Sequence, residues 1–228
     1  MVTSRRPRDY RATSQHRPTV LLTGFDPFDG ESLNPSWLAV QALHGKHIAG
    51  HRVVAAQLPT VFGESLAALA RLLRQHKPAL VACIGQAGGR SALSLERVAI
   101  NVNDARIADN ASAQPVDTPV VPGGPAAYFT TLPIKAMRQA VQAEGIAAEV
   151  SQTAGTFVCN HVFYGLMHAL ATRRGFKRTR GGFIHVPLLP EQGTPCMPLE
   201  QIVRGLSVAL RCALATETDV VQQAGAIS

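Results

Sequence analysis

The sequence contains only four cysteines, and their spacing excludes several common uses of this residue. Cys83, Cys159, Cys196 and Cys212 are far apart, without a C-x-x-C pair and without histidines at zinc-binding spacing. The first residues are polar and basic, with no apolar segment of the kind that a secretory signal needs. We therefore expect no disulfide framework, no bound metal and a reducing, cytoplasmic setting.

Two further absences narrow the possible functions. No apolar run is long enough to span a bilayer, so we expect no membrane partner. The glycine-rich segment 85–90 lacks the G-x-G-x-x-G spacing, and no phosphate-binding lysine follows it. These two patterns argue against nucleotide binding, and we expect no cofactor. The glycosylation sequon at residues 110–112 is then interpreted as a chance occurrence.

Positive charge is in excess, with a formal net charge of +7. Much of it lies in two clusters, the arginines before residue 18 and the basic residues of 173–180. An arginine-rich arm is one candidate for nucleic-acid binding, which would be steeply salt-dependent and lost on removal of residues 1–18. Aromatic residues for base stacking are not interleaved with these arginines. We therefore favour a disordered, solvated N-terminal tail over residues 1–18 and expect no nucleic-acid partner.

Short apolar runs alternate with helical patterns along the rest of the chain. This alternation predicts an α/β fold with a mostly parallel sheet flanked by helices. We expect one domain over residues 19–218, with a loose C-terminal tail over residues 219–228. The polar stretch 109–124, rich in proline, aspartate and glycine, predicts a long exposed loop. The predicted strands are 19–23, 51–58, 79–84, 95–106, 146–152 and 181–187, and the predicted helices are 35–43, 65–75, 133–144, 160–170 and 199–216.

The segment 149–173 holds the strongest candidate for chemistry. A turn of small residues precedes an apolar run of helical period, and Cys159 lies at the junction. If a helix begins at Asn160, its N-terminal N–H groups lower the pKa of the Cys159 thiol and favour the thiolate. Glu96 and His185 also stand near predicted strand ends, and they supply the carboxylate and imidazole that cysteine catalysis needs. The alternative is a buried structural cysteine.

Seven sequence blocks, taken in order, resemble a known family. The blocks are GFDPFDGESLNPSW, LPTVF, IGQAGGR, LERVAINVNDARIADN, GGPAAYFTTLPI, SQTAGTFVCNHVFYGLMH and GGFIHVP. They closely resemble the pyroglutamyl peptidase I family, also called pyrrolidone-carboxylate peptidases, from about Val20 to the final helix. The resemblance implies a three-layer α/β/α sandwich around a mostly parallel, mixed sheet. It also implies a soluble, usually homotetrameric, metal-free thiol peptidase.

The same resemblance assigns residues to roles. It implies that Cys159 is the nucleophile, that His185 is the general base and acid, and that Glu96 orients His185. The implied substrate is a peptide with an N-terminal pyroglutamyl residue, which is released through a thioester. Arg106 and the backbone N–H of Cys159 are the expected donors to the tetrahedral oxygen. Groups around Gln86 are expected to bond the lactam, in an apolar slot formed by Phe25, Phe28, Thr60, Ile107, Phe157 and Val158.

A few positions depart from the family pattern or allow another interpretation. Ala108 and Leu95 replace prolines that are common in the family, which affects loop rigidity rather than a catalytic group. His161 is a second candidate base because it follows Cys159 by two residues. Neighbouring helical positions face different directions, so we interpret His161 as structural or solvated. A redox sensor that uses Cys159 as an oxidisable thiol stays open as a different class of function.

Overall fold

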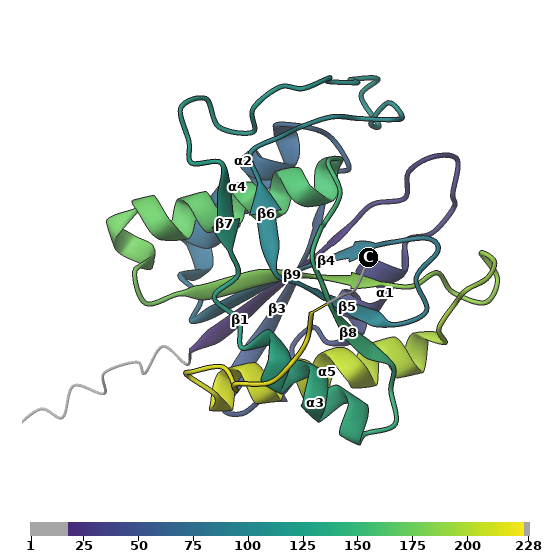
Figure 1. Ribbon diagram of the computed structural model, residues 1–228, viewed down its shortest axis with the longest axis vertical. Helices are drawn as coiled ribbons and strands as arrows, with labels where there is room; N and C mark the ends of the chain where they lie inside the picture. The colour runs from purple at the N-terminus through teal and green to yellow at the C-terminus, as the bar shows by residue number, and fades with distance from the viewer. Residues whose placement is uncertain (1–17, 226–228) are drawn as a thin grey trace, which may run out of the picture.

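The computed structural model describes residues 18–225. All but the last residue of the predicted disordered tail 1–18 lies outside the described residues, as do residues 226–228. A seven-stranded sheet forms the centre of the molecule, with strand order β2-β3-β1-β4-β9-β5-β8 (Figure 1). A second, two-stranded sheet pairs β6 with β7. The elements are β1 (Thr19–Phe25), α1 (Pro35–Ala42), β2 (His47–Ile48), β3 (His51–Leu58), α2 (Glu64–His76), β4 (Leu80–Gln86), β5 (Leu93–Glu96), β6 (Val98–Ile100), β7 (Ala127–Phe129), α3 (Ile134–Ala143), β8 (Ala148–Ser151), α4 (Val158–Thr172), the 3₁₀ turn η1 (Arg174–Phe176), β9 (Arg180–Val186) and α5 (Leu199–Ala215).

The large sheet is mixed, with a parallel centre. Strands β3, β1, β4 and β9 run parallel to one another. β5 is antiparallel to β9 and parallel to β8, and β2 is antiparallel to β3. Parallel strands need covered faces, because their crossover connections place helices on both sides. The central strands β1, β4 and β9 are accordingly buried along almost their whole length.

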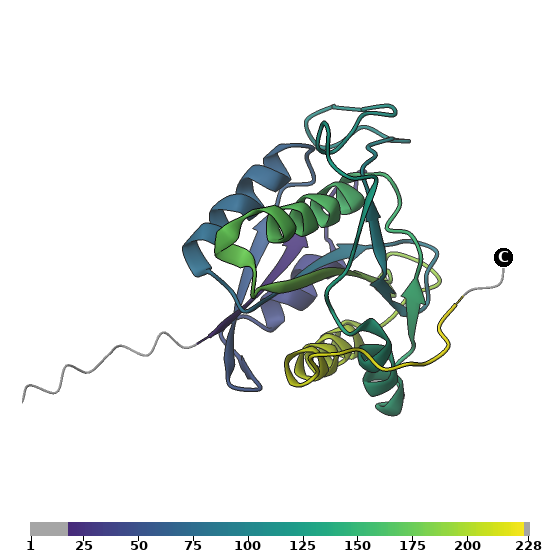
Figure 2. The ribbon, with the colours of Figure 1, turned by 60° about the vertical axis from the view of Figure 1, so that its left-hand side comes forward.

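Helices cover both faces of this sheet (Figure 2). Residues of α1, α3 and α5 pack with one set of alternating strand residues, which includes Leu22, Ile84 and Ile184. Residues of α2 and α4 pack with the other set, which includes Val81 and Phe183. Because successive strand residues point to opposite faces, each central strand supplies both cores. The predicted three-layer α/β/α sandwich is confirmed.

The start of α1 shows how local chemistry places a loop. Asn34 is the N-cap residue, and its Oδ1 accepts a hydrogen bond from the Ser36 N–H at 3.0 Å. Pro35 occupies the first turn, where a missing N–H costs no hydrogen bond. The Asn34 side chain also donates through Nδ2 to the Asp26 carbonyl at 3.0 Å. One residue therefore both begins the helix and fixes the loop that follows β1.

The predicted strand 95–106 is wrong in its extent. β5 ends at Glu96, and β6 begins at Val98 in the other sheet. At Arg97 the backbone N–H donates to the Ser151 carbonyl, and the Arg97 carbonyl accepts from the Thr130 N–H. The chain therefore changes its pairing partner at Arg97, from the strand β8 to the segment after β7. Sequence alternation continues across this point, so it gives no sign of the change.

The segment after α5 has no helix or strand as far as residue 225, yet it is attached to the domain. Both carboxylate oxygens of Asp219 accept hydrogen bonds at the start of α3, from the N–H groups of Lys135 and Ala136 at 3.0 and 2.9 Å. Arg138 donates to the Gln223 carbonyl at 3.2 Å. The sequence predicts a loose tail from residue 219, whereas Asp219 caps a helix whose own N-cap residue, Pro133, makes no side-chain cap.

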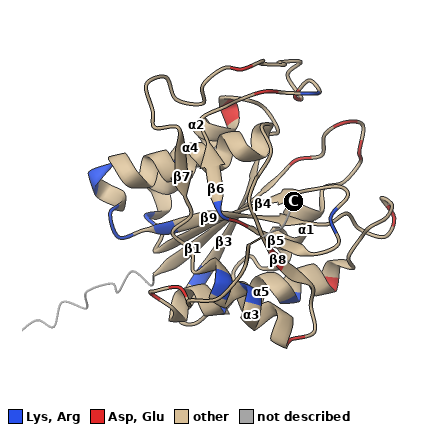
Figure 3. Cartoon of the chain, in the orientation of Figure 1, with Lys and Arg blue, Asp and Glu red and all other residues tan. Residues whose placement is uncertain are grey.

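Lys and Arg residues gather on α3 and α5 and at the turn after α4 (Figure 3). This distribution agrees with the basic cluster that the sequence shows at 173–180. No helix within residues 18–225 is long and apolar enough to cross a membrane.

Candidate active site

Three neighbouring strands place polar groups on the sheet face that α4 covers. Gly85 on β4 is paired in register with His185 on β9, and Ser94 on β5 lies opposite His185 from the other side. Residues two apart in a strand share a face, so Glu96 lies on the same face as Ser94 and His185. Glu96 is the last residue of β5, and His185 is the penultimate residue of β9. The antiparallel pairing of β5 with β9 thus makes the two side chains diagonal neighbours.

Glu96 and His185 form a buried hydrogen-bonded pair. His185 Nδ1 lies 2.7 Å from Glu96 Oε1, and the two side chains are 4% and 0% exposed. A carboxylate only accepts hydrogen bonds, so Nδ1 carries the proton and Nε2 is left as a proton acceptor. Burial lowers the pKa of His185, although the hydrogen bond and charge of Glu96 act in the opposite direction. At neutral pH the imidazole is therefore a neutral base.

Cys159 is the second residue of α4, and its sulfur lies above Gly85 of β4. A Cβ built on Gly85 would be 2.8 Å from Cys159 Sγ and 2.7 Å from a ring carbon of Phe183. Real Cβ atoms do not approach other heavy atoms so closely, so this position needs glycine. Because Gly85 is the register partner of His185, the thiol and the imidazole stand over neighbouring positions of adjacent strands.

The predicted lowering of the Cys159 pKa is wrong in this structure. The helix begins at Val158 rather than at Asn160, so Cys159 does lie in the first turn, where unpaired N–H groups are available. Burial nevertheless raises the pKa of the Cys159 thiol to about 12; the charge of Glu96 raises it further, and that of Arg90 lowers it. The resting sulfur is therefore a neutral thiol. A nucleophilic thiolate forms only if its proton is transferred, and His185 is the neighbouring base.

A narrow pocket opens beside the Cys159 sulfur. It lies between the loops that follow β1, β3 and β4 and the start of α4. Aromatic rings dominate its walls, with Phe28 and Phe157 centroids 6.1 Å apart. None of the lining side chains carries a charge. The lining residues are Phe25, Phe28, Asn34, Thr60, Gln86, Phe157, Val158 and Cys159.

Two aspartates hold the loops that form this pocket. The Thr60 N–H donates to Asp26 Oδ1 at 2.6 Å, and Thr60 Oγ1 donates to the Asp26 carbonyl at 3.1 Å. The Phe62 N–H donates to Asp109 Oδ2 at 2.8 Å. The loops after β1 and β3 and the long loop that contains Asp109 are therefore tied together. Such ties let irregular segments present a fixed apolar slot.

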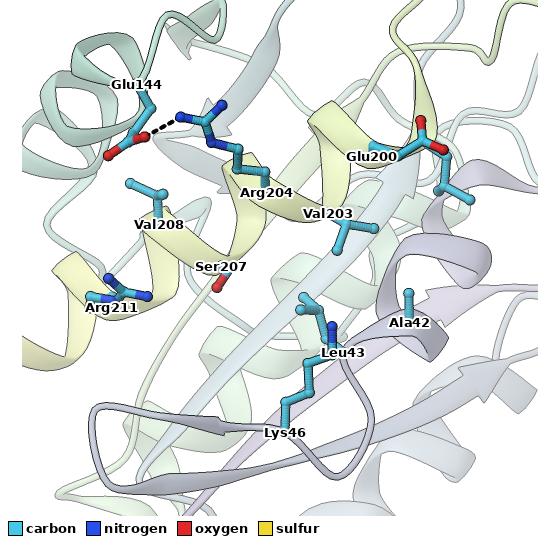
Figure 4. Close-up of a pocket in the computed structure, with 11 residues that line it drawn as sticks. Ala42, Leu43, Lys46, Glu144, Glu200, Val203, Arg204, Ser207, Val208 and Arg211 are labelled. Atoms are coloured by element: carbon cyan, nitrogen blue, oxygen red, sulfur yellow. Dashed lines mark hydrogen bonds and ion pairs between the residues drawn. The ribbon is translucent and has the colours of Figure 1, made fainter.

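A second pocket, wider than the one beside Cys159, lacks the groups needed for cysteine catalysis. Figure 4 shows this wide pocket between α5 and the end of α1, on the sheet face opposite to Cys159. It contains charged side chains but no cysteine or histidine, and its Arg204 is paired with Glu144. Within residues 18–225 no group of three His, Cys, Asp or Glu side chains is arranged to hold a metal ion.

A sequence model of the family described as pyroglutamyl peptidase matches residues 18–216. The chain belongs to the pyroglutamyl peptidase family. It is 61% identical over 212 residues to the pyrrolidone-carboxylate peptidase of Cupriavidus pinatubonensis, with 91% of this chain and 98% of that protein covered. The pyrrolidone-carboxylate peptidase of Bacillus cytotoxicus is 53% identical with the same coverage.

Solved structures of the family have the same fold. Pyroglutamyl peptidase I from Bacillus amyloliquefaciens is 50% identical, with a TM-score of 0.87 over 89% of this chain and 100% of that chain. A mutant pyrrolidone carboxyl peptidase from the hyperthermophile Pyrococcus furiosus is 41% identical, with a TM-score of 0.83 over 86% of this chain and 98% of that chain. The predicted fold class and family are thus confirmed.

Six of the seven residues that the resemblance implies for the substrate slot line the pocket beside Cys159. The described residues that line the pocket do not include Ile107, but they do include the other predicted members Phe25, Phe28, Thr60, Gln86, Phe157 and Val158. Asn34 also lines the pocket, whereas the sequence predicts only a capping role for it. The capping role can be predicted because Asn34 directly precedes Pro35. Its place in the pocket wall depends on how the loop after β1 folds.

The arginine beside the buried pair is Arg90, for which the sequence predicts no role in the site. Arg90 Nη1 donates to Glu96 Oε1 at 2.7 Å. Arg106, the arginine expected to support the site, is exposed, and within residues 18–225 its guanidinium makes no hydrogen bond or ion pair. Its backbone carbonyl accepts from Gln114. Arg90 ends the glycine-rich segment that follows β4. Its place after the carboxyl end of a strand, where ligand sites of α/β folds lie, is the one sequence feature that points to a role in the site.

His161 is a buried structural residue of this family member. Its Nε2 accepts from the Gly63 N–H at 3.0 Å, and its Nδ1 donates to Asn103 Oδ1 at 2.9 Å. Both ring nitrogens are therefore used to join the start of α4 to the loop before α2 and to the segment after β6. Burial lowers the pKa of His161 from its ordinary value of 6.5 to about 4. The side chain is neutral at neutral pH and does not act as a second base.

This neutral histidine predicts an acid-sensitive fold. Because the folded pKa of about 4 lies below the ordinary value of 6.5, the unfolded chain binds a proton first as the pH falls. The stabilisation is complete above about pH 6.5 and is lost progressively toward pH 4. Between pH 7.5 and 5.0, His161 should account for about 2 kcal/mol of the decrease in unfolding free energy.

Urea unfolding at the two pH values and at one protein concentration measures this decrease. His161→Gln should be less stable than the wild type at pH 7.5, with a smaller further loss at pH 5.0. His47→Gln, which changes an exposed histidine, should keep the wild-type pH dependence. An unchanged pH dependence in His161→Gln would rule out His161 as a source of acid sensitivity.

Proposed function

We propose that this chain is a cysteine peptidase that removes an N-terminal pyroglutamyl residue from peptides, with Cys159 as nucleophile, His185 as general base and acid, and Glu96 as the group that orients His185. One observation carries the assignment. In a member of the pyroglutamyl peptidase family, a buried Glu96–His185 pair lies beside a thiol at the edge of an uncharged aromatic pocket.

The first half of the reaction forms a thioester. His185 takes the proton of the Cys159 thiol on Nε2, and the sulfur attacks the carbonyl that joins the pyroglutamyl ring to the next residue. A carbon–sulfur bond forms, and the carbonyl oxygen becomes an oxyanion. The carbon–nitrogen bond then breaks as the imidazolium of His185 gives its proton to the leaving amine. Glu96 stabilises the imidazolium through Nδ1.

The second half of the reaction releases the product. Water gives a proton to His185 Nε2 and attacks the thioester carbon. The carbon–sulfur bond breaks, pyroglutamate leaves, and the sulfur recovers its proton from His185. Donors to the oxyanion in both steps are the Cys159 N–H, which lies in the first turn of α4, and Arg106. The exposed Arg106 side chain would have to turn toward the pocket when substrate binds.

The pocket matches a neutral lactam ring. Phenylalanine rings provide apolar contact, and Gln86 and Thr60 provide polar edges for the ring amide. Because no lining side chain is charged, a glutamate terminus would bury its ammonium and carboxylate without partners. A proline terminus lacks the ring carbonyl and carries a charged amine, so the pocket's polar groups would stay unpaired.

The expected result is release of a chromogenic amine from its pyroglutamyl amide and not from its prolyl amide, with at least about 10³-fold discrimination. The measurement uses the purified, reduced protein, and treatment with iodoacetamide should abolish the activity. Equal cleavage of the two amides would exclude the proposed specificity. A folded, reduced protein that cleaves neither amide would favour the redox-sensor hypothesis.

We further propose that the protein works as a cytoplasmic homotetramer without a nucleic-acid partner. The exposed apolar side chains Val116 and Phe129, which are 64% and 69% accessible, support association through the loop between β6 and β7 and through β7 itself. The molar mass from light scattering tests this proposal, and a monomeric mass at assay concentration would contradict it.

A further inference from the structure

We propose that Arg90 is a positioning residue of the active site: its guanidinium joins the Glu96 carboxylate to the loop that leads to Cys159, and thereby fixes the geometry of the three catalytic groups. The inference rests on the roles proposed above for Glu96, His185 and Cys159. It adds a residue that neither the sequence blocks nor the family match assigns to the reaction.

The guanidinium of Arg90 contacts two different elements. Nη1 donates to Glu96 Oε1 at 2.7 Å, and Nη2 donates to the Thr153 carbonyl at 3.1 Å. Glu96 is the last residue of β5, whereas Thr153 lies in the loop between β8 and α4. The same carbonyl accepts from Ser151 Oγ at 3.0 Å. The planar guanidinium therefore links the end of β5, which carries Glu96, to the loop that leads to Cys159.

Glu96 depends on Arg90 for its orientation. Its Oε1 accepts from both Arg90 and His185, each at 2.7 Å. Among the described residues, no donor reaches the buried Oε2. Two donors that approach one oxygen from different elements define the rotation of the carboxylate, and removing one leaves His185 alone to hold it. A misplaced carboxylate would turn the imidazole away from the sulfur, and small displacements of this kind are costly for catalysis.

Arg90 also contributes charge to the site. Glu96 from β5 and Arg90 from the loop after β4 are the charged groups that act on both His185 and Cys159, and Cys83 from β4 also acts on Cys159. Burial dominates the pKa values of both Cys159 and His185. Glu96 raises both pKa values and Arg90 lowers both. Loss of Arg90 should therefore move the ionisation of thiol and imidazole together toward higher pH.

The test compares Arg90→Met and Arg90→Lys with Arg74→Met, a control that changes an exposed arginine on α2. The first measurement is the rate of Cys159 alkylation by iodoacetamide as a function of pH, followed by mass spectrometry, and it needs no substrate. In Arg90→Met the profile should move up by about one pH unit. Arg90→Lys keeps the charge, so its profile should stay within about 0.3 unit of the wild type.

The second measurement is turnover of the pyroglutamyl amide. Arg90→Met should lower kcat by about 10- to 100-fold, with KM changed by less than about twofold. Arg90→Lys should recover part of this loss, because an ammonium can bind Glu96 but cannot reach Glu96 and Thr153 in the fork geometry. Arg74→Met should match the wild type in both measurements.

Wild-type alkylation profiles and kcat in a folded Arg90→Met would overturn the inference. So would equal losses in Arg90→Met and Arg90→Lys with unmoved pH profiles, because a purely structural role predicts that pattern. If Arg90→Met does not fold, Arg90→Gln takes its place, because it also removes the charge and should move the alkylation profile up while it lowers kcat. If the wild type cleaves no pyroglutamyl amide, the proposed function fails, and the alkylation profiles still decide the role of Arg90.

Discussion

Replacement of Cys159 by alanine is expected to lower kcat for a pyroglutamyl amide by about 10⁵- to 10⁶-fold, the range seen when a catalytic nucleophile is removed. The reason is that Cys159 is the only cysteine among the described residues that line the aromatic pocket. The pocket itself should survive, because the substitution removes only one atom at the bottom of an apolar slot. Steady-state kinetics with the chromogenic amide measures the loss.

A matched control separates the nucleophile from the other thiols. Cys212→Ser changes a partly buried thiol on α5, on the opposite face of the sheet, and should keep wild-type kcat. Mass spectrometry of the wild type after a short treatment with substrate and acid should show the added mass of one pyroglutamyl group on Cys159. Activity in Cys159→Ala above about one thousandth of the wild type would assign the chemistry to another residue.

Replacement of Glu96 by glutamine is expected to lower kcat by about 10³- to 10⁴-fold. The amide keeps the shape of the carboxylate but loses the charge that stabilises the His185 imidazolium. It also leaves the Arg90 guanidinium beside a neutral group, so the remaining charge next to His185 is positive. Glu96 raises the pKa of His185, so its loss should shift the acid limb of kcat/KM toward lower pH. This direction is opposite to that expected for Arg90→Met.

Both effects are measured by recording kcat and kcat/KM as a function of pH for Glu96→Gln and for the wild type. Glu144→Gln is the matched control, because Glu144 is an exposed partner of Arg204 on the other face of the sheet, and it should behave as the wild type. A Glu96→Gln variant that keeps more than about a tenth of wild-type kcat would show that His185 needs no carboxylate to orient it.

Much of the fold was available from the sequence because its signals are local. The strands β1, β3, β4 and β9 and the helices α1, α2, α3 and α5 coincide with predicted segments, since buried strands and amphipathic helices carry their own periodicity. Asn34 and Pro35 marked a helix start for the same reason. The proposed catalytic residues were identified by the resemblance of the seven sequence blocks to the family, and not by the spacing of the residues.

The tertiary structure alone decided the features that join distant segments. His185 and Glu96 are 89 residues apart, and the antiparallel placement of β5 beside β9 makes them partners. Position 85 needs glycine because the Cys159 sulfur lies directly above it. Burial raises the pKa of that thiol, and this effect outweighs the lowering expected from its place in the first turn of α4. Arg90 was not selected because an arginine in a glycine loop has no periodic or motif signal until a folded sheet brings Glu96 and Thr153 within its reach. Local propensity therefore determined the elements, while contacts across the sheet, which sequence periodicity does not encode, determined the chemistry of the site.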